Sequence, residues 1–193
     1  MRPGLADPVL DSQRIFRGVL DAMAHPGRIV PLPPPPDPPA PLVPAAAAVA
    51  LTLLDYETPL WLDAACSTGP VIEWLRFHCG CPLVTSPGGA AFALLADAER
   101  LPGLDAFDAG SDEFPDRSAT VIVQVTGLRA GTGRWLRGPG IDSARRLEIQ
   151  GMPERFWSMC LENNARFPRG IDLILVADSR VVALPRTTLT AEA

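Results

Sequence analysis

The sequence contains no lysine, so all 17 of its basic residues are arginines. Two kinds of chemistry that depend on a lysine side chain are therefore excluded from this chain. Pyridoxal phosphate cannot form its Schiff base with the protein, and the phosphate-binding loop GxxxxGK[ST] cannot be completed. We expect the protein to work without a cofactor.

Long apolar runs are also missing. The longest, residues 45–54 and 171–177, are shorter than the roughly 20 apolar residues that cross a bilayer. Residues 1–11 carry prolines and acids where a secretory signal would have an apolar stretch. We expect a cytoplasmic protein with no membrane partner.

The usual catalytic motifs are absent as well. No GxSxG sequence occurs, and His25 and His78 are the only histidines, which leaves little material for a Ser/His/Asp triad. The sequence Gly131-Thr132-Gly133 lacks the third glycine of a dinucleotide fingerprint, because Leu136 stands there. These absences argue against an autonomous small-molecule enzyme.

The net charge of −5 argues against nucleic acid as a partner, because nonspecific binding needs a positive field. The four cysteines, without an export signal, are expected to be reduced thiols. His78, Cys79 and Cys81 form an H-C-G-C cluster, but the remaining cysteines are scattered, and a structural zinc needs four paired ligands. We expect no metal site.

A chain of 193 residues with 47% hydrophobic residues has the size of one compact unit, so we expect a single domain over residues 1–193. Nine prolines between Pro31 and Pro44 predict a stiff polyproline II connector at the surface. An SH3-type ligand is the alternative interpretation of this segment.

Hydrophobic periodicity predicts a mixed sheet with helices on its faces, hence an α/β fold. The expected helices cover residues 12–24 after an Asp11 cap, 45–54, 68–79 after a Ser67 cap, and 153–165 with Pro153 in the first turn. The expected strands are 59–62, 83–85, 91–95, 119–125, 133–136, 146–149, 171–177 and 181–184. Residues 119–125 are apolar on both faces, which is typical of a central strand.

Arg186 is the leading candidate for ligand binding. It ends the last expected strand and precedes Thr187 and Thr188, and an arginine beside hydroxyls suits a phosphate or phosphonate oxygen. A tail anchored by one salt bridge is an equally good interpretation. Asp172 has the simple alternative of pairing with an arginine.

Arg76 and His78 are the other candidates for chemistry. They stand in the last turn of an expected helix, where cations offset the negative end of the helix dipole, so a structural role explains them too.

Six segments together resemble the PhnH family, which belongs to the bacterial carbon-phosphorus lyase complex. They are FRGVLDAMAHPG (16–27), LTLLDYETPLWL (51–62), LRFHCGCPLV (75–84), LRGPGI (136–141), FPRGIDLIL (167–175) and ALPRTT (183–188). Arg76, His78, Asp172 and Arg186 lie inside these segments and remain the catalytic candidates, with Arg186 and Thr187 as ligand-binding candidates. His25 and the cysteines gain nothing from the resemblance.

The resemblance implies a three-layer α/β/α sandwich similar to pyridoxal-phosphate-dependent transferases but without the cofactor. It also implies a homodimer that assembles with subunits G, I and J in phosphonate catabolism. There it would support transfer of phosphonate to ribose C1 of ATP with displacement of adenine. The alternative is a non-catalytic subunit that supplies only interfaces.

Overall fold

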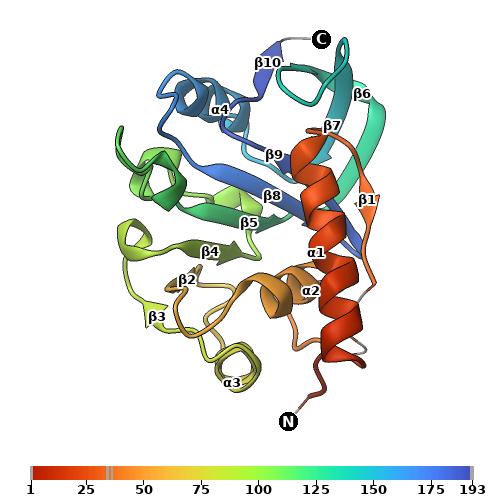
Figure 1. The fold of residues 1–193 in the computed structure, drawn as a ribbon, viewed down its shortest axis with the longest axis vertical. Coiled ribbons are helices and arrows are strands. Elements are labelled where there is room, and N and C mark those ends of the chain that lie inside the picture. The colour runs from red at the N-terminus through yellow and green to blue at the C-terminus, as the bar shows by residue number, and fades with distance from the viewer. Residues whose placement is uncertain (1, 34, 36, 192–193) are drawn as a thin grey trace.

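A computed structural model describes residues 2–33, 35 and 37–191, and it contains two sheets (Figure 1). The large sheet has seven strands in the order β1-β9-β8-β5-β4-β2-β3. Its strands are β1 (Val30–Pro31), β2 (Leu60–Leu62), β3 (Leu83–Val84), β4 (Phe92–Leu95), β5 (Thr120–Gln124), β8 (Asp172–Ala177) and β9 (Arg180–Leu184). The strands from β3 to β8 pair in parallel, whereas β8–β9 and β9–β1 pair antiparallel.

The small sheet is antiparallel and has the order β10-β6-β7. It consists of β6 (Gly127–Arg137), β7 (Arg145–Gln150) and β10 (Leu189–Ala191). The expected strand at 133–136 is thus only part of a much longer one. Neither β1 nor β10 was expected, because two or three residues give no readable alternation.

Helices cover one face of the large sheet. They are α1 (Pro8–Ala24), α2 (Pro44–Leu53) and α3 (Gly69–His78), and Figure 1 shows α1 and α2 in front of the strands. Six consecutive residues of α2, from Ala45 to Ala50, are fully buried, since small side chains allow the helix to lie close to its neighbours.

The opposite face of the large sheet is covered by one helix, the small sheet and an irregular segment, and not by a layer of helices. Its core joins strand residues to α4 (Phe156–Asn164), to the small sheet and to the segment around residues 98–107. The structure therefore confirms a mixed α/β fold, while the expected third layer of helices is one helix plus a small sheet. β5 lies in the middle of the seven strands, as its sequence predicted.

Three helix starts differ from the predictions. Asp7, and not Asp11, caps α1: its carboxylate accepts from the Val9 and Leu10 amides at 3.1 and 3.0 Å, and Pro8 fits the first turn. Thr68, and not Ser67, precedes α3. α4 begins at Phe156, because Pro153 forms only a preceding turn.

The described part of the proline-rich connector, residues 31–33, 35 and 37–44, is packed more tightly than a surface spacer, and residues 34 and 36 lie outside the described residues. Leu32 and Leu42 within it are buried, and the side chain of Gln124 holds the segment by accepting from the Val43 amide and donating to the Pro41 carbonyl. Among the described residues, no helix is long and apolar enough to span a membrane.

Candidate functional site

A cleft of about 540 Å³ lies where the end of α1 meets the residues that follow β9. We call it the α1–tail cleft. It is lined by Met23, Ala24, Pro115, Asp116, Pro139, Gly140, Phe167, Pro168, Asp172, Pro185, Arg186 and Thr187. Most of these side chains are apolar, and the charged ones are Asp116, Asp172 and Arg186.

Four of the six segments that carry the family resemblance meet in this cleft. Segment 16–27 supplies the end of α1, 136–141 the turn after β6, 167–175 the start of β8, and 183–188 the residues after β9. Only Pro115 and Asp116 of the lining come from outside these segments. Segments far apart in the sequence are thus assembled around one cavity.

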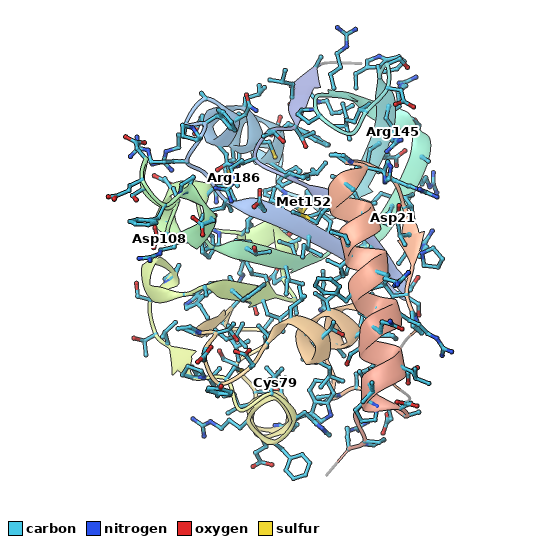
Figure 2. All side chains as sticks on the ribbon, viewed as in Figure 1. Asp21, Cys79, Asp108, Arg145, Met152 and Arg186 are labelled. Carbon is cyan, nitrogen blue, oxygen red and sulfur yellow. The ribbon has the colours of Figure 1, made fainter. Side chains whose placement is uncertain are left out.

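Gly140 allows the turn after β6 to approach the end of α1 closely, and this contact forms one wall of the cleft. Gly140 has φ +79°, and a Cβ there would collide with the Ala24 carbonyl oxygen at the end of α1. A side chain at this position would therefore force the backbone to shift. Arg145 of β7, labelled in Figure 2, lies at the same corner. It donates to the His25 and Pro26 carbonyls at 3.0 and 2.8 Å.

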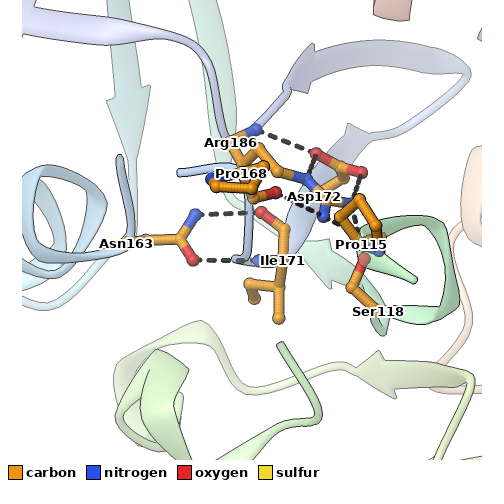
Figure 3. A network of polar contacts seen from close by, with 7 residues as sticks. All are labelled: Pro115, Ser118, Asn163, Pro168, Ile171, Asp172 and Arg186. Carbon is orange, nitrogen blue, oxygen red and sulfur yellow. Dashed lines mark hydrogen bonds and ion pairs between the residues drawn. The ribbon is translucent and has the colours of Figure 1, made fainter. Parts of the chain in front are cut away.

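Arg186 is fully engaged within the chain (Figure 3). Its Nε and Nη2 donate to the two oxygens of Asp172 at 3.2 and 2.6 Å. Nη1 donates to the carbonyls of Pro115 (2.6 Å) and Pro168 (3.5 Å), and Nη2 also donates to Ser118 Oγ. A guanidinium has five N–H donors, and all five are used here.

This network favours the structural role of Arg186 over the ligand-binding one. The side chains of Arg186 and Asp172 are only 12% and 17% exposed, and the Arg186 amide also donates to Asp172 at 2.8 Å. A phosphate oxygen could gain a donor from this arginine only by displacing an existing bond. The pairing of Asp172 with an arginine is what the sequence offered as its simpler alternative.

The sheet topology explains why the strand-end argument is weak here. Ligands in α/β sheets bind outside the carboxyl ends of the parallel strands. β9 runs antiparallel to β8, so Arg186 lies beside the amino ends of β8 and β5. Arg186 does follow the end of a strand, but it lies at the amino ends of the parallel strands, opposite to the ends where ligands bind.

The carboxyl edge holds buried polar groups that the sequence did not suggest. Asp63, after β2, accepts from the amides of Cys66 (2.7 Å), Ala96 (3.0 Å) and Asp97 (2.9 Å). It is 5% exposed and ties the loop after β2 to the loop after β4. Both carboxylate oxygens of Asp63 accept hydrogen bonds from backbone amides. This role could have been predicted only from the register of β2 with β4.

The two threonines after Arg186 do not act as a pair. Thr187 lines the α1–tail cleft, whereas Thr188 is buried on the side facing Cys160 and Leu173. The Thr188 hydroxyl has no hydrogen-bond partner among the described residues. Two hydroxyls sharing one oxyanion, as the sequence suggested, are therefore not formed in this arrangement.

Arg76 and His78 are not brought to the cleft. Both belong to the last turn of α3, beside the β3 edge of the sheet, while Arg186 follows β9 near the other edge. His78 contacts the N-terminal segment, with Nε2 3.1 Å from the Arg2 carbonyl oxygen. The four catalytic candidates thus fall in two separate places.

Asp116, Met23 and Phe167 are cleft residues that the sequence reasoning missed. Met23 and Phe167 lie inside the quoted family segments, which were a usable signal, whereas Asp116 lies in an irregular acidic connection with none. Within the described part of the chain, no three His, Cys, Asp or Glu side chains gather as a metal site.

Comparison with known proteins gives a family match over nearly the whole chain. The family described as "Bacterial phosphonate metabolism protein (PhnH)" matches residues 3–191. The alpha-D-ribose 1-methylphosphonate 5-triphosphate synthase subunit PhnH of Rhizobium meliloti (strain 1021) is 43% identical over 95% of this chain and 92% of its own length. The putative C-P lyase subunit protein HtxG of Stutzerimonas stutzeri is 35% identical, over 91% and 84% respectively.

Proposed function

Because this chain belongs to the PhnH family of bacterial phosphonate metabolism proteins, we propose that it is a subunit of a carbon-phosphorus lyase complex. In that complex it supports the transfer of phosphonate to ribose C1 of ATP with displacement of adenine. The relative in Rhizobium meliloti bears the name of a synthase subunit, which supports this step over the later bond cleavage.

The observation that carries the proposal is the α1–tail cleft. Four separate segments of the family resemblance supply ten of its twelve lining residues. A cleft of 540 Å³ is within the range of sites for small molecules. We therefore assign this cleft, and not the end of α3, as the place where this subunit contributes to the reaction.

The charges of the cleft explain why the chain would not act alone. A triphosphate and a phosphonate are anions, and proteins bind such groups with cationic donors. Among the described residues that line the cleft, Arg186 is the only cation, and its donors are occupied, while Asp116 adds a negative charge. The cationic groups for an anionic substrate would thus come from a neighbouring subunit.

An apolar stripe on α1 supports the formation of a homodimer and of a larger assembly with subunits G, I and J. Val9, Phe16 and Leu20 lie on one face of the helix and are 77%, 50% and 55% exposed. Ala24, four residues after Leu20, lines the cleft, so the stripe leads into it. An exposed apolar patch of this kind is typical of an interaction surface.

We also propose that the subunit works without pyridoxal phosphate, although we expect its fold to be related to that of pyridoxal-phosphate-dependent transferases. The absence of lysine supports this, because the cofactor has no amine with which to form its internal aldimine. Cytoplasmic location remains a prediction of the sequence.

A non-catalytic assembly subunit is the second candidate function. The saturated bonding of Arg186 favours it, because the best ligand-binding candidate serves to join Pro115, Ser118 and Asp172 within the chain. In this case the cleft would receive a side chain of a partner subunit in place of a substrate.

Reconstitution tests whether the reaction requires this chain, which both candidate functions predict. Partner subunits are purified with and without this chain, and adenine release from ATP is measured in the presence of methylphosphonate. We expect adenine release to require this chain. Unchanged release without it, together with failure to co-purify, would refute the proposed function.

Two cleft variants then test the chemistry, Thr187→Val and Asp116→Ala. Neither side chain belongs to the Arg186 network. The substrate-handling function predicts complexes that assemble normally and release adenine at least about tenfold more slowly, the loss that about 1.4 kcal/mol produces. Full activity of both assembled variants would instead support the structural subunit.

The α1 stripe is tested with Phe16→Glu against Tyr56→Glu, an equally drastic change at an exposed aromatic residue away from α1. We expect Phe16→Glu to weaken self-association by about tenfold or more, because a charge is placed in an apolar contact. Tyr56→Glu should leave the dissociation constant in sedimentation experiments unchanged. Equal effects of the two variants would exclude α1 as the contact surface.

A further inference from the structure

A second cleft, of about 490 Å³, lies between α4 and the irregular segment that follows β4. We call it the α4–loop cleft. Residues 103–105 form one wall, and α4 with the residues at its two ends forms the other. The residues of the second wall follow one another at intervals of three and one, so they share one face of the helix; they are Arg155, Ser158, Met159, Glu162, Asn163 and Arg166.

The base of this cleft is buried and held in place. Leu104, Met159 and Asn163 are the buried members of its lining. The Asn163 side chain accepts from the Ile171 amide and donates to the Ile171 carbonyl, both at 2.9 Å (Figure 3). The cleft therefore has a largely apolar base whose polar member is fixed by the backbone, an arrangement typical of small-molecule sites.

Four charged side chains, two arginines and two acids, line the cleft and are exposed. They are Asp105, Arg155, Glu162 and Arg166. Within the described part of the chain none of them forms an ion pair, although Glu162 and Arg166 have the i,i+4 spacing that favours one. Their charges are therefore available to a bound molecule.

The two arginines differ in how they are held. Arg155 Nη2 donates to the Leu101 carbonyl at 2.7 Å, which joins the start of α4 to the loop across the cleft. A guanidinium has five N–H donors, so most of those of Arg155 remain available. The Arg166 side chain forms no hydrogen bond with any described residue. Arg186 of the α1–tail cleft, by contrast, has all its donors occupied.

The order of the charges along α4 indicates the kind of ligand. Arg155 and Arg166 stand at the two ends of the helix face, about 16 Å apart along the axis, and Glu162 lies between them. Guanidinium groups bind phosphate oxygens with two parallel hydrogen bonds, whereas carboxylates accept from hydroxyl groups. A ligand that matches this pattern has an anionic group at each end and hydroxyl groups between them.

We propose that the α4–loop cleft binds a phosphorylated polyol, in its simplest form a sugar bisphosphate. Arg155 and Arg166 hold the phosphate groups, and Asp105 and Glu162 accept from the hydroxyls. A bare inorganic anion fits less well, because the two carboxylates repel it and receive no hydroxyl in return. The site shares no residue with the α1–tail cleft and does not depend on the function proposed for that cleft.

Calorimetric titration of the full-length chain tests the site, in a phosphate-free buffer near neutral pH. The probes are fructose 1,6-bisphosphate and inorganic pyrophosphate, which carry comparable charge but differ in hydroxyl groups. We expect the sugar bisphosphate to bind with a dissociation constant below about 1 mM, and at least about tenfold more tightly than pyrophosphate.

Arg166→Ala removes one cation without removing a bond that the fold uses, because this side chain has no hydrogen-bond partner among the described residues. Loss of a charge-assisted contact should weaken binding of the sugar bisphosphate by about ten- to a hundredfold. Arg180→Ala is the matched control, because Arg180 is also exposed but begins β9, outside the cleft. It should leave the dissociation constant unchanged.

Glu162→Gln distinguishes recognition of a polyol from attraction of any anion. A neutral amide accepts from a hydroxyl less strongly than a carboxylate does, so the sugar bisphosphate should bind more weakly. Pyrophosphate should bind more tightly, because a repelling charge has been removed. The variant should thus affect the two probes in opposite directions.

Each of three results would overturn the proposal. The first is the absence of saturable binding of the sugar bisphosphate at about 1 mM. The second is an equal loss in Arg166→Ala and Arg180→Ala, which would show that only the net charge of the chain matters. The third is a change in Glu162→Gln that has the same sign for both probes, because it would show that hydroxyl groups are not recognised.

Discussion

Replacing Arg186 by alanine separates its structural role from a ligand-binding role. The change removes the guanidinium that pairs with Asp172, and it leaves that carboxylate and the Pro115 carbonyl without their strongest partner. Breaking a buried ion pair from one side costs about 3 to 5 kcal/mol. The side chains keep 12% and 17% of their exposure, so we take the lower value of about 3 kcal/mol.

The expected result is a large loss of thermal stability. In a chain of this size each kcal/mol corresponds to about 2 to 4 °C in Tm, so Arg186→Ala should lower Tm by roughly 6 to 12 °C. Scanning calorimetry of the isolated protein measures this directly. Replacing both partners, as Arg186→Met with Asp172→Asn, should recover part of the loss because no buried charge remains unpaired.

Arg169→Ala is the matched control. Arg169 belongs to the family segment that contains Asp172 and pairs with Asp112 at 3.1 Å, but the two side chains are 51% and 81% exposed. Exposed pairs contribute about 0 to 1 kcal/mol, so Tm should change by less than about 4 °C. The reasoning is refuted if Arg186→Ala keeps the parental Tm while adenine release by the assembled complex falls about tenfold, because that pattern belongs to a ligand contact.

Three further predictions concern the cleft wall, pH and the cofactor. Gly140→Ala should destabilise the protein by about 1 to 3 kcal/mol more than Gly131→Ala in urea unfolding, since both have φ near +80° but only Gly140 meets a backbone oxygen. The free energy of unfolding should fall as pH rises from about 9 toward 12, because the buried thiol of Cys160, with its pKa raised to about 12, holds its proton in the folded state only. Cys160→Ala should make this slope less steep but not remove it, because burial raises the pKa of the Cys66 thiol as well. Incubation with pyridoxal phosphate and borohydride should leave no covalent adduct at any side chain, as mass spectrometry can verify.

The sequence predicted the core of the fold because the central elements have strong local signals. The β-branched run at 119–125 is apolar on both faces, and only a strand buried on both faces satisfies that pattern, so its place in the middle of the sheet followed. Helix α2 was predicted from a comparable pattern, because nearly all of its residues are apolar and such a helix is buried on most sides. The short strands β1 and β10 could not be predicted, because their existence depends on partners elsewhere in the chain.

The helix starts show where local rules compete. Asp7 and Asp11 both precede apolar residues at helical spacing, and both are good cap residues. The structure uses both, since Asp7 caps the Val9 and Leu10 amides while Asp11 accepts from the Asp7 amide at 3.0 Å. Pro8 decides between them, because it has no amide hydrogen to leave unpaired in the first turn.

The sequence analysis offered an arginine partner for Asp172 and a salt bridge for Arg186 as alternatives, but it did not pair these two residues with each other. A two-residue connection at Asp178-Ser179 implies an antiparallel hairpin, and the observed register pairs Leu173 with Leu184. Asp172, at the start of β8, and Arg186, two residues after the end of β9, must then lie close together. An arginine and an aspartate at those positions predict an ion pair before they predict a ligand site. Because Arg186 is thereby occupied, the charge that an anionic substrate needs at the α1–tail cleft has to be sought on a partner subunit, which is the physical reason to test this protein within its complex.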